Sequence, residues 1–150
     1  MNKQTRILVV DDDENIRNTM KAILESEGYT VDIAANGMEA IKRSEKTAYN
    51  VALLDIRLPD MEGVELLKLI KDAVPRTRKI MVTGYPSMQN AVAALNKNAD
   101  AYMVKPVDIE KLLNMVKEQL ELQENERQFS EQKVAEFIET RVKELSIAHV

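Results

Sequence analysis

Residues 6–13 read RILVVDDD, a short apolar run that ends abruptly in three carboxylates. Residues 51–54 (VALL) are followed in the same way by Asp55, and residues 79–83 (KIMVT) end in a hydroxyl. Short runs of branched apolar residues predict strands that are buried on both faces, as in parallel sheets covered by helices. Two further strands are predicted at residues 30–34 (TVDIA) and 101–104 (AYMV).

Apolar residues between these runs recur at the three- and four-residue spacing of helices that cover a core. The helical positions are Ile16, Met20, Ile23 and Leu24; Met38, Ala40 and Ile41; Val64, Leu66, Leu67 and Ile70; and Val92 with Leu95. A fifth helix is predicted after Pro106. Because strands and helices alternate, the sequence favours an α/β fold with an open five-stranded parallel sheet and helices on both faces.

Composition bounds the possible functions. Hydrophobic residues make up 45% of the 150, which is enough for a core and excludes a disordered or fibrous chain. No apolar run approaches the roughly 20 residues of a membrane span, no signal peptide is recognisable, and there is no cysteine, so the expected location is the cytoplasm. Residues 107–150 hold ten acidic and six basic side chains, and a negatively charged tail argues against direct nucleic-acid binding by this chain.

The C-terminal part predicts a long helix. Its first turns, at Ile109, Leu112, Leu113, Val116 and Leu120, form an amphipathic face, and no glycine or proline follows to end the helix. We therefore divide the chain into a domain at residues 1–120 and a helical extension at residues 121–150. An apolar stripe resumes in the extension, which favours a stalk that pairs with a partner, including a second copy of the chain; a solvated single helix is the alternative. The stripe consists of Val134, Phe137, Ile138, Val142 and Leu145.

Polar side chains follow the ends of four predicted strands. They are Asp11, Asp12 and Asp13 after the first, Asp55 after the third, Thr83 and Gly84 at the fourth, and Lys105 after the fifth. Each alone has an ordinary explanation, such as a helix cap or a turn. Ligands of open parallel sheets bind at the carboxyl ends of the strands, where these side chains would meet. Several carboxylates at one edge repel one another unless a cation lies among them.

The oxygen-rich ligand set suits magnesium, which uses one or two carboxylates and a phosphate oxygen. Asp12 and Asp55 would supply carboxylates, Asp11 would act directly or through water, and the backbone carbonyl of Arg57 lies two residues beyond Asp55. Lys105 adds a mobile positive charge that suits a phosphoryl group on Asp55 better than a lone metal site. The hydroxyl of Thr83 can donate to a phosphoryl oxygen.

Four motifs in this order resemble the receiver domains of two-component response regulators. They are VVDDD at 9–13, LLDIRLPDMEG at 53–63, VTGYPS at 82–87 and AYMVKP at 101–106. The resemblance covers about residues 5–120 and is specific because separate positions agree in both order and spacing. It implies a flavodoxin-like fold with strand order 2-1-3-4-5 and phosphorylation of Asp55 by a histidine kinase or a phosphotransfer protein.

The resemblance also implies roles for individual residues. Magnesium would be held by Asp11, Asp12, Asp55 and the Arg57 carbonyl; Thr83 and Lys105 would contact the phosphoryl group; and the Lys105–Pro106 bond would be cis. Tyr102 corresponds to an aromatic whose rotamer reports phosphorylation, and the surface at residues 87–96 and 101–104 would move with it. Arg57 and Tyr85 would flank the path of attacking water, whereas the terminal His149 is not a site candidate.

Three alternatives remain. A magnesium-dependent phosphatase that forms an aspartyl-phosphate would carry a second aspartate where this chain has Arg57, and the chain has no inserted cap. A nucleotide-binding domain would need a glycine-rich loop, whereas residues 11–15 read DDDEN. A receiver that serves as a helical scaffold or dimerisation module is compatible with the sequence. We expect a phosphoacceptor that promotes its own phosphoryl transfer without turning over an outside substrate, and the sequence does not identify its output.

Overall fold

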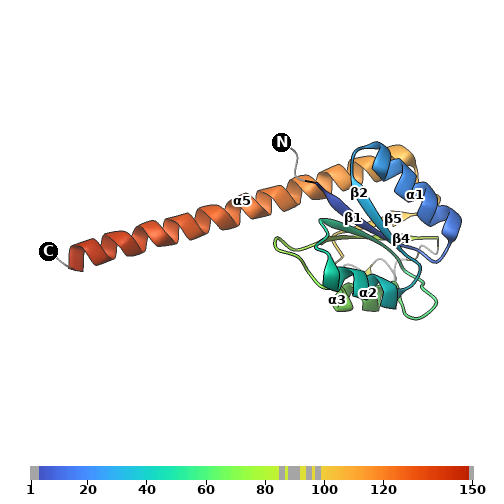
Figure 1. The fold of residues 1–150 in the computed structure, drawn as a ribbon, viewed down its shortest axis with the longest axis horizontal. Coiled ribbons are helices and arrows are strands. Elements are labelled where there is room, and N and C mark those ends of the chain that lie inside the picture. The colour runs from blue at the N-terminus through green and yellow to red at the C-terminus, as the bar shows by residue number, and fades with distance from the viewer. Residues whose placement is uncertain (1–3, 85–86, 88–91, 94–95, 97–98, 149–150) are drawn as a thin grey trace.

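The computed structural model describes residues 4–84, 87, 92–93, 96 and 99–148. Five parallel strands form one sheet in the order 2-1-3-4-5, which confirms the predicted fold (Figure 1). In this sheet β1 pairs with β2 and β3, and β4 lies between β3 and β5. The strands are β1 (Arg6–Val10), β2 (Thr30–Ala34), β3 (Val51–Asp55), β4 (Arg78–Thr83) and β5 (Ala101–Val104).

Helices cover both faces of the sheet. Figure 1 shows α1 (Glu14–Ser26) and α5 (Ile109–Ala148) on one face and α2 (Gly37–Lys46) and α3 (Gly63–Leu69) on the other. Of the helix predicted around Val92 and Leu95, the described residues Val92, Ala93 and Asn96 are helical. Leu95, Tyr85 and His149, on which other predictions fall, lie outside the described residues.

Alternate residues of each strand feed two separate apolar layers. In β1, Leu8 and Val10 face the α2 and α3 side, whereas Ile7 and Val9 face α1 and α5. This alternation follows from the two-residue period of a strand. The residues of β3 and β4 are therefore all buried, and in β1 only the first residue, Arg6, is partly exposed.

At the carboxyl edge, two aspartates accept hydrogen bonds from the N-termini of helices. Asp13 is the N-cap of α1, and its carboxylate accepts from the backbone N–H groups of Asn15 and Ile16. Asp60, in the loop after β3, accepts from the N–H groups of Gly37 and Met38 at the start of α2. These two hydrogen bonds lower the pKa of Asp60. The loop that follows Asp55 is thus tied to a helix on the same face.

A group of polar side chains, which we call the base clamp, joins α5 to the opposite edge of the sheet. Gln119 accepts from Arg78 Nε at 2.9 Å, and Gln123 donates to the carbonyls of Asn50 at 2.9 Å and Arg76 at 3.0 Å. Both glutamines are only 4% exposed. The base clamp comprises Asn50, Arg76, Arg78, Asp100, Gln119, Gln123 and Glu126.

The helix α5 is continuous for 40 residues and projects far beyond the sheet (Figure 1). Glu126 pairs with Arg76 and Arg78 at 3.6 and 3.7 Å. Contacts with the domain therefore extend past residue 120, where the sequence division places the start of the extension. Of the sequence-predicted stripe, Val134, Phe137, Ile138, Val142 and Leu145 are all more than half exposed.

Candidate functional site

Three aspartates meet at the carboxyl edge of the sheet. Asp11 follows β1, and Asp55 is the last residue of β3, the neighbouring strand. Asp11 and Asp55 are 2% and 6% exposed, whereas Asp12 is open to solvent. Carboxylate oxygens of the three residues lie within 4.8 Å of one another. The strand order thus brings together side chains that are more than forty positions apart in the chain.

Lys105 reaches into this acidic group from the end of β5. Its ammonium lies 2.7 Å from Asp11 Oδ2 and 3.2 Å from Asp55 Oδ2. Its backbone N–H donates to the carbonyl of Thr83 at 2.8 Å, which continues the pairing of β4 with β5. The Lys105–Pro106 peptide bond is cis. The lysine charge is therefore shared between two aspartates instead of pairing with Asp55 alone.

The charges of the site perturb one another. Burial raises the pKa of Asp55, and the charge of Asp11 raises it further, whereas Lys105 and the N–H of Arg57 act in the opposite direction. Burial would lower the pKa of the Lys105 ammonium, but its hydrogen bond with Asp11 and the charges of Asp11 and Asp55 outweigh burial and raise that pKa. Asp55 is thus a carboxylate whose ionisation depends on nearby positive charge.

Gly63 allows α3 to begin directly against Asp55. A Cβ atom at this position would lie 2.0 Å from the Asp55 carbonyl oxygen, which is far inside van der Waals contact. The N–H of Gly63 donates to the Ile56 carbonyl at 2.6 Å. Residue pattern alone does not predict this role, although Gly63 is the last residue of the motif LLDIRLPDMEG. By contrast, a Cβ at Gly84 would meet Lys105 Cδ at an ordinary 3.7 Å.

The other predicted site residues surround the aspartates. Arg57 donates its backbone N–H to Asp55 Oδ1 at 3.3 Å. Thr83 is fully buried at the end of β4, next to β5. Tyr102 packs partly buried against the core layer on the α2 and α3 side, and its hydroxyl is buried without a hydrogen-bond partner among the described residues.

A cavity of about 420 Å³ lies over the acidic group. Its walls include Asp11, Asp12, Asp55, Arg57 and Lys105. Its lining holds four carboxylates, including Asp13, and two cationic side chains, Arg57 and Lys105, which together leave a formal charge of −2 when ionised. Oxygen donors of this number and charge fit a hard divalent cation such as magnesium, which prefers carboxylates and retains water. The buried position of Asp55 beside Asp11 agrees with this fit, because a cation would offset their repulsion.

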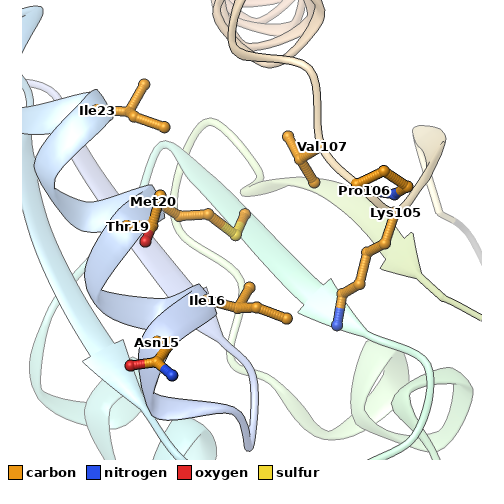
Figure 2. A pocket seen from close by; sticks show the side chains of 8 residues that line it. All are labelled: Asn15, Ile16, Thr19, Met20, Ile23, Lys105, Pro106 and Val107. Atoms are coloured by element: carbon orange, nitrogen blue, oxygen red, sulfur yellow. The ribbon is translucent and has the colours of Figure 1, made fainter.

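A second cavity of about 470 Å³ adjoins the first and is mainly apolar. Figure 2 shows Ile16, Met20 and Ile23 on α1 on one side of it and Pro106 and Val107 on the other. Lys105 and Ile16 line both cavities. The site therefore opens beside an apolar groove between α1 and residues 105–107, which precede α5.

A family model for the response regulator receiver domain matches residues 7–117. The chain belongs to the response-regulator receiver family. This receiver is 39% identical over 110 residues to the transcriptional regulatory protein ZraR of Klebsiella oxytoca, a match that covers 73% of this chain and 25% of that protein.

Solved structures agree with this assignment. The receiver shares a TM-score of 0.79 and 51% identity with a CheY-like receiver domain protein from Methanospirillum hungatei, covering 83% of this chain and 99% of that one. A response regulator from Burkholderia pseudomallei, solved with a phosphorylated aspartic acid and a calcium ion, has a TM-score of 0.69 and 31% identity, covering 82% and 73% of the two chains.

The receiver spans only part of its curated relatives, from 24% of the ZraR protein of Escherichia coli to 54% of the response regulator ArlR from Staphylococcus saprophyticus. The matched region ends before the distal half of α5. Among the described residues, no helix combines the length and hydropathy that crossing a bilayer requires.

Proposed function

We propose that this receiver is the phosphoacceptor of a two-component phosphorelay and that Asp55 accepts the phosphoryl group. The observation that carries the proposal is the position of Asp55, a nearly buried carboxylate at a strand end, with Asp11, Asp12 and Lys105 around it. If Asp55 served only in a structural ion pair, Lys105 alone would be a sufficient partner. Asp11 and Asp12 beside it add negative charge that Lys105 offsets only in part, and a positively charged ligand would relieve the rest.

Phosphorylation joins an Asp55 carboxylate oxygen to phosphorus while the bond from phosphorus to the donor breaks. With a phosphohistidine donor the leaving group is the imidazole, which then takes up a proton from solvent. Asp11, Asp12, Asp55 and the Arg57 carbonyl would hold magnesium. When bound, magnesium neutralises charge on the phosphoryl oxygens and on the carboxylates. The attacking oxygen must be unprotonated, and Lys105 favours that form.

The phosphorylated site gives Lys105 and Thr83 a new partner. An acyl phosphate adds about −1.5 to −2 charge and new acceptor oxygens, to which the Lys105 ammonium and the Thr83 hydroxyl can donate. Lys105 now divides its charge between Asp11 and Asp55, so a stronger acceptor would redirect it. Tyr102 lies on β5, three residues before Lys105, and its buried hydroxyl has no hydrogen-bond partner among the described residues. Its reorientation would carry the change to the surface of β5 and into α5.

The expected partner is a sensor histidine kinase or a phosphotransfer protein. A donor must bring its phosphohistidine to the acidic cavity, and the adjoining apolar groove offers surface for its docking. Relatives named as transcriptional regulatory proteins extend far beyond the matched part. A nucleic-acid role would therefore reside in segments outside the receiver, and the acidic α5 does not favour one for this chain. The receiver promotes its own phosphoryl transfer and does not turn over an outside substrate.

The proposal is tested by incubating the protein with acetyl phosphate and magnesium and measuring a phosphoryl mass increment. We expect one increment on the wild-type chain, none on Asp55→Asn, and none when a chelator removes magnesium. Asp60→Asn, which changes an exposed carboxylate in the same loop, is the matched control and should be labelled like the wild type. Equal labelling of Asp55→Asn would refute the assignment.

Amide hydrogen exchange with a phosphoryl mimic tests the switch. Exchange should change at residues 101–104 and at the start of α5, and Thr83→Ala should weaken that response while leaving Asp55 open to labelling. No change in these segments of the wild type would show that Asp55 is modified without moving this surface.

A further inference from the structure

The distal part of α5 carries an apolar stripe that nothing in the described chain covers. Val134, Phe137, Ile138, Val142 and Leu145 are 52% to 66% exposed. Contiguous apolar surface of this kind marks an interaction site more often than isolated exposed residues do. A surface that buries this stripe would therefore come from another molecule.

The stripe lies on the same face of α5 that packs on the sheet. Val134 follows Val116 by 18 residues, and Ile138 follows Leu120 by the same number. At 3.6 residues per turn, 18 residues make five complete turns, so each pair points in one direction. Val116 is fully buried and Leu120 packs partly buried against the same layer. The inner face of α5 thus continues past the receiver and loses its cover.

The base clamp fixes this direction relative to the receiver. Gln123 holds the backbone before β3 and before β4, and Glu126 pairs with Arg76 and Arg78. Among the described residues, Glu126 is the last residue of α5 with an ion pair to the receiver. The uncovered stripe begins eight residues later, on the side of the helix on which the receiver lies.

This placement decides how two copies can pair. Packed helices lie about 8–10 Å apart. Consider a partner helix that runs parallel to α5 and covers the stripe. Its N-terminal part would enter the space where β3 and β4 pack against α5. The receiver attached to that partner helix would occupy the same space. An antiparallel partner runs the opposite way, and its receiver lies at the far end of the pair. Only the antiparallel arrangement covers the stripe of a straight helix without this collision.

In the antiparallel register four of the five stripe residues lie opposite one another, and Ile138 lies opposite Arg141. Val134 of one copy lies opposite Leu145 of the other, and Phe137 lies opposite Val142, because each pair of numbers sums to 279. In that register Ala148 of the partner lies opposite Glu131, which is five residues beyond Glu126. The described helix of each copy therefore stops short of the other receiver.

The charges at one edge of the stripe are complementary in the same register. Lys133, Phe137 and Glu144 are spaced by four and seven residues, so they lie along one edge of the helix. In an antiparallel pair this edge faces the same edge of the partner. Lys133 of each copy then approaches Glu144 of the other: in this register Lys133 lies directly opposite position 146, two residues from Glu144. A parallel pair would separate these two charges by 11 residues, about 16 Å.

We propose that residues 131–148 of α5 bind a second copy of this chain as an antiparallel two-helix pair, which places the two receivers at opposite ends. The inference goes beyond the phosphoryl chemistry and does not depend on it. The paired segment is shorter than the three to four heptads of a self-sufficient coiled coil, so dimerisation should rise with protein concentration.

Sedimentation of the full chain tests the surface. We expect Leu145→Asp to lose the dimer. Phe129→Asp is the matched control, because Phe129 is 61% exposed on the same helix but lies 140° around it from Val134. A wild-type chain that remains monomeric at all concentrations would overturn the proposal, as would equal loss in both variants.

Charge reversal and cross-linking test the orientation. Lys133→Glu alone should weaken dimerisation about two- to tenfold, and adding Glu144→Lys should restore it. Since the chain has no cysteine, Val134→Cys and Leu145→Cys each carry a single thiol. Mixed in equal amounts, they should form the mixed disulfide. Disulfides of each variant with itself, without the mixed product, would show a parallel pair and refute the antiparallel one.

Discussion

At the scale of single residues, the site depends on close backbone approach as well as on charged side chains. Gly63 brings the start of α3 to the carbonyl of Asp55, and Lys105 holds two aspartates together. The charged residues are visible in the sequence because each directly follows an apolar run. The sequence does not show which of them form ion pairs. The distances in the structure show that Lys105 shares its charge between Asp11 and Asp55.

Gly63→Ala should destabilise the protein. The added Cβ would lie 2.0 Å from the Asp55 carbonyl, so the backbone must shift, and overpacking of this kind typically costs about 1–3 kcal/mol. Urea unfolding measures the loss. Gly84→Ala is the control, because its Cβ meets only an ordinary contact and should change stability by less than about 0.5 kcal/mol. Equal effects of the two substitutions would contradict the close approach at Gly63.

Asp100 should make stability depend on pH. Burial alone would raise its pKa, but hydrogen bonds from Arg76 and from the Lys79 N–H outweigh burial and lower it. A lowered folded-state pKa stabilises the protein above the unfolded value of about 3.9 and loses that effect as pH falls through the folded value. Asp100→Asn should therefore cost about 1–3 kcal/mol at pH 7.

Unfolding of Asp100→Asn and the wild type across a pH series checks this expectation. The difference in unfolding free energy should shrink as pH falls below about 4, where the wild-type carboxylate also becomes protonated. A difference that is constant from pH 7 to pH 3 would show that the carboxylate charge contributes nothing.

At the scale of elements, strands were easier to predict than the reach of α5. Apolar runs predict all five strands to within one residue at either end, because a doubly buried strand needs apolar residues on both faces. The extent of α5 contact was less visible. Periodicity counts apolar residues, and Gln119 and Gln123 are buried through hydrogen bonds instead. Nothing in a polar stretch marks which glutamine is buried.

Gln123→Leu should weaken the attachment of α5. The substitution removes the donor to the carbonyls of Asn50 and Arg76 and the acceptor for the Asn50 amide, and unsatisfied buried groups cost about 1–3 kcal/mol. Urea unfolding measures the total effect, and amide exchange in residues 119–126 shows where it acts. Gln128→Leu, exposed one turn further along, is the matched control. If both variants unfold alike, the base clamp does not stabilise the receiver.

At the scale of the whole molecule, the two edges of the sheet carry different tasks. The carboxyl edge gathers the aspartates and Lys105, and the opposite edge holds the base clamp. The resemblance in sequence covers the first edge well, since its motifs lie at strand ends. The family model ends at residue 117, two residues before Gln119, the first α5 residue of the base clamp.

Because α5 begins near the carboxyl edge of the sheet and is held by Gln123 at the opposite edge, it has the geometry of a lever with Gln123 as its fulcrum. The arm from Ile109 to Gln123 is about 21 Å long, and the arm from Gln123 to Ala148 is about 38 Å long, at 1.5 Å per residue. For a rigid rod, a 1 Å sideways shift at Ile109 becomes a shift of roughly 1.8 Å in the opposite direction at the tip. In such a rod, a small movement beside Lys105 would be enlarged at the distal end of α5, where a partner helix would bind.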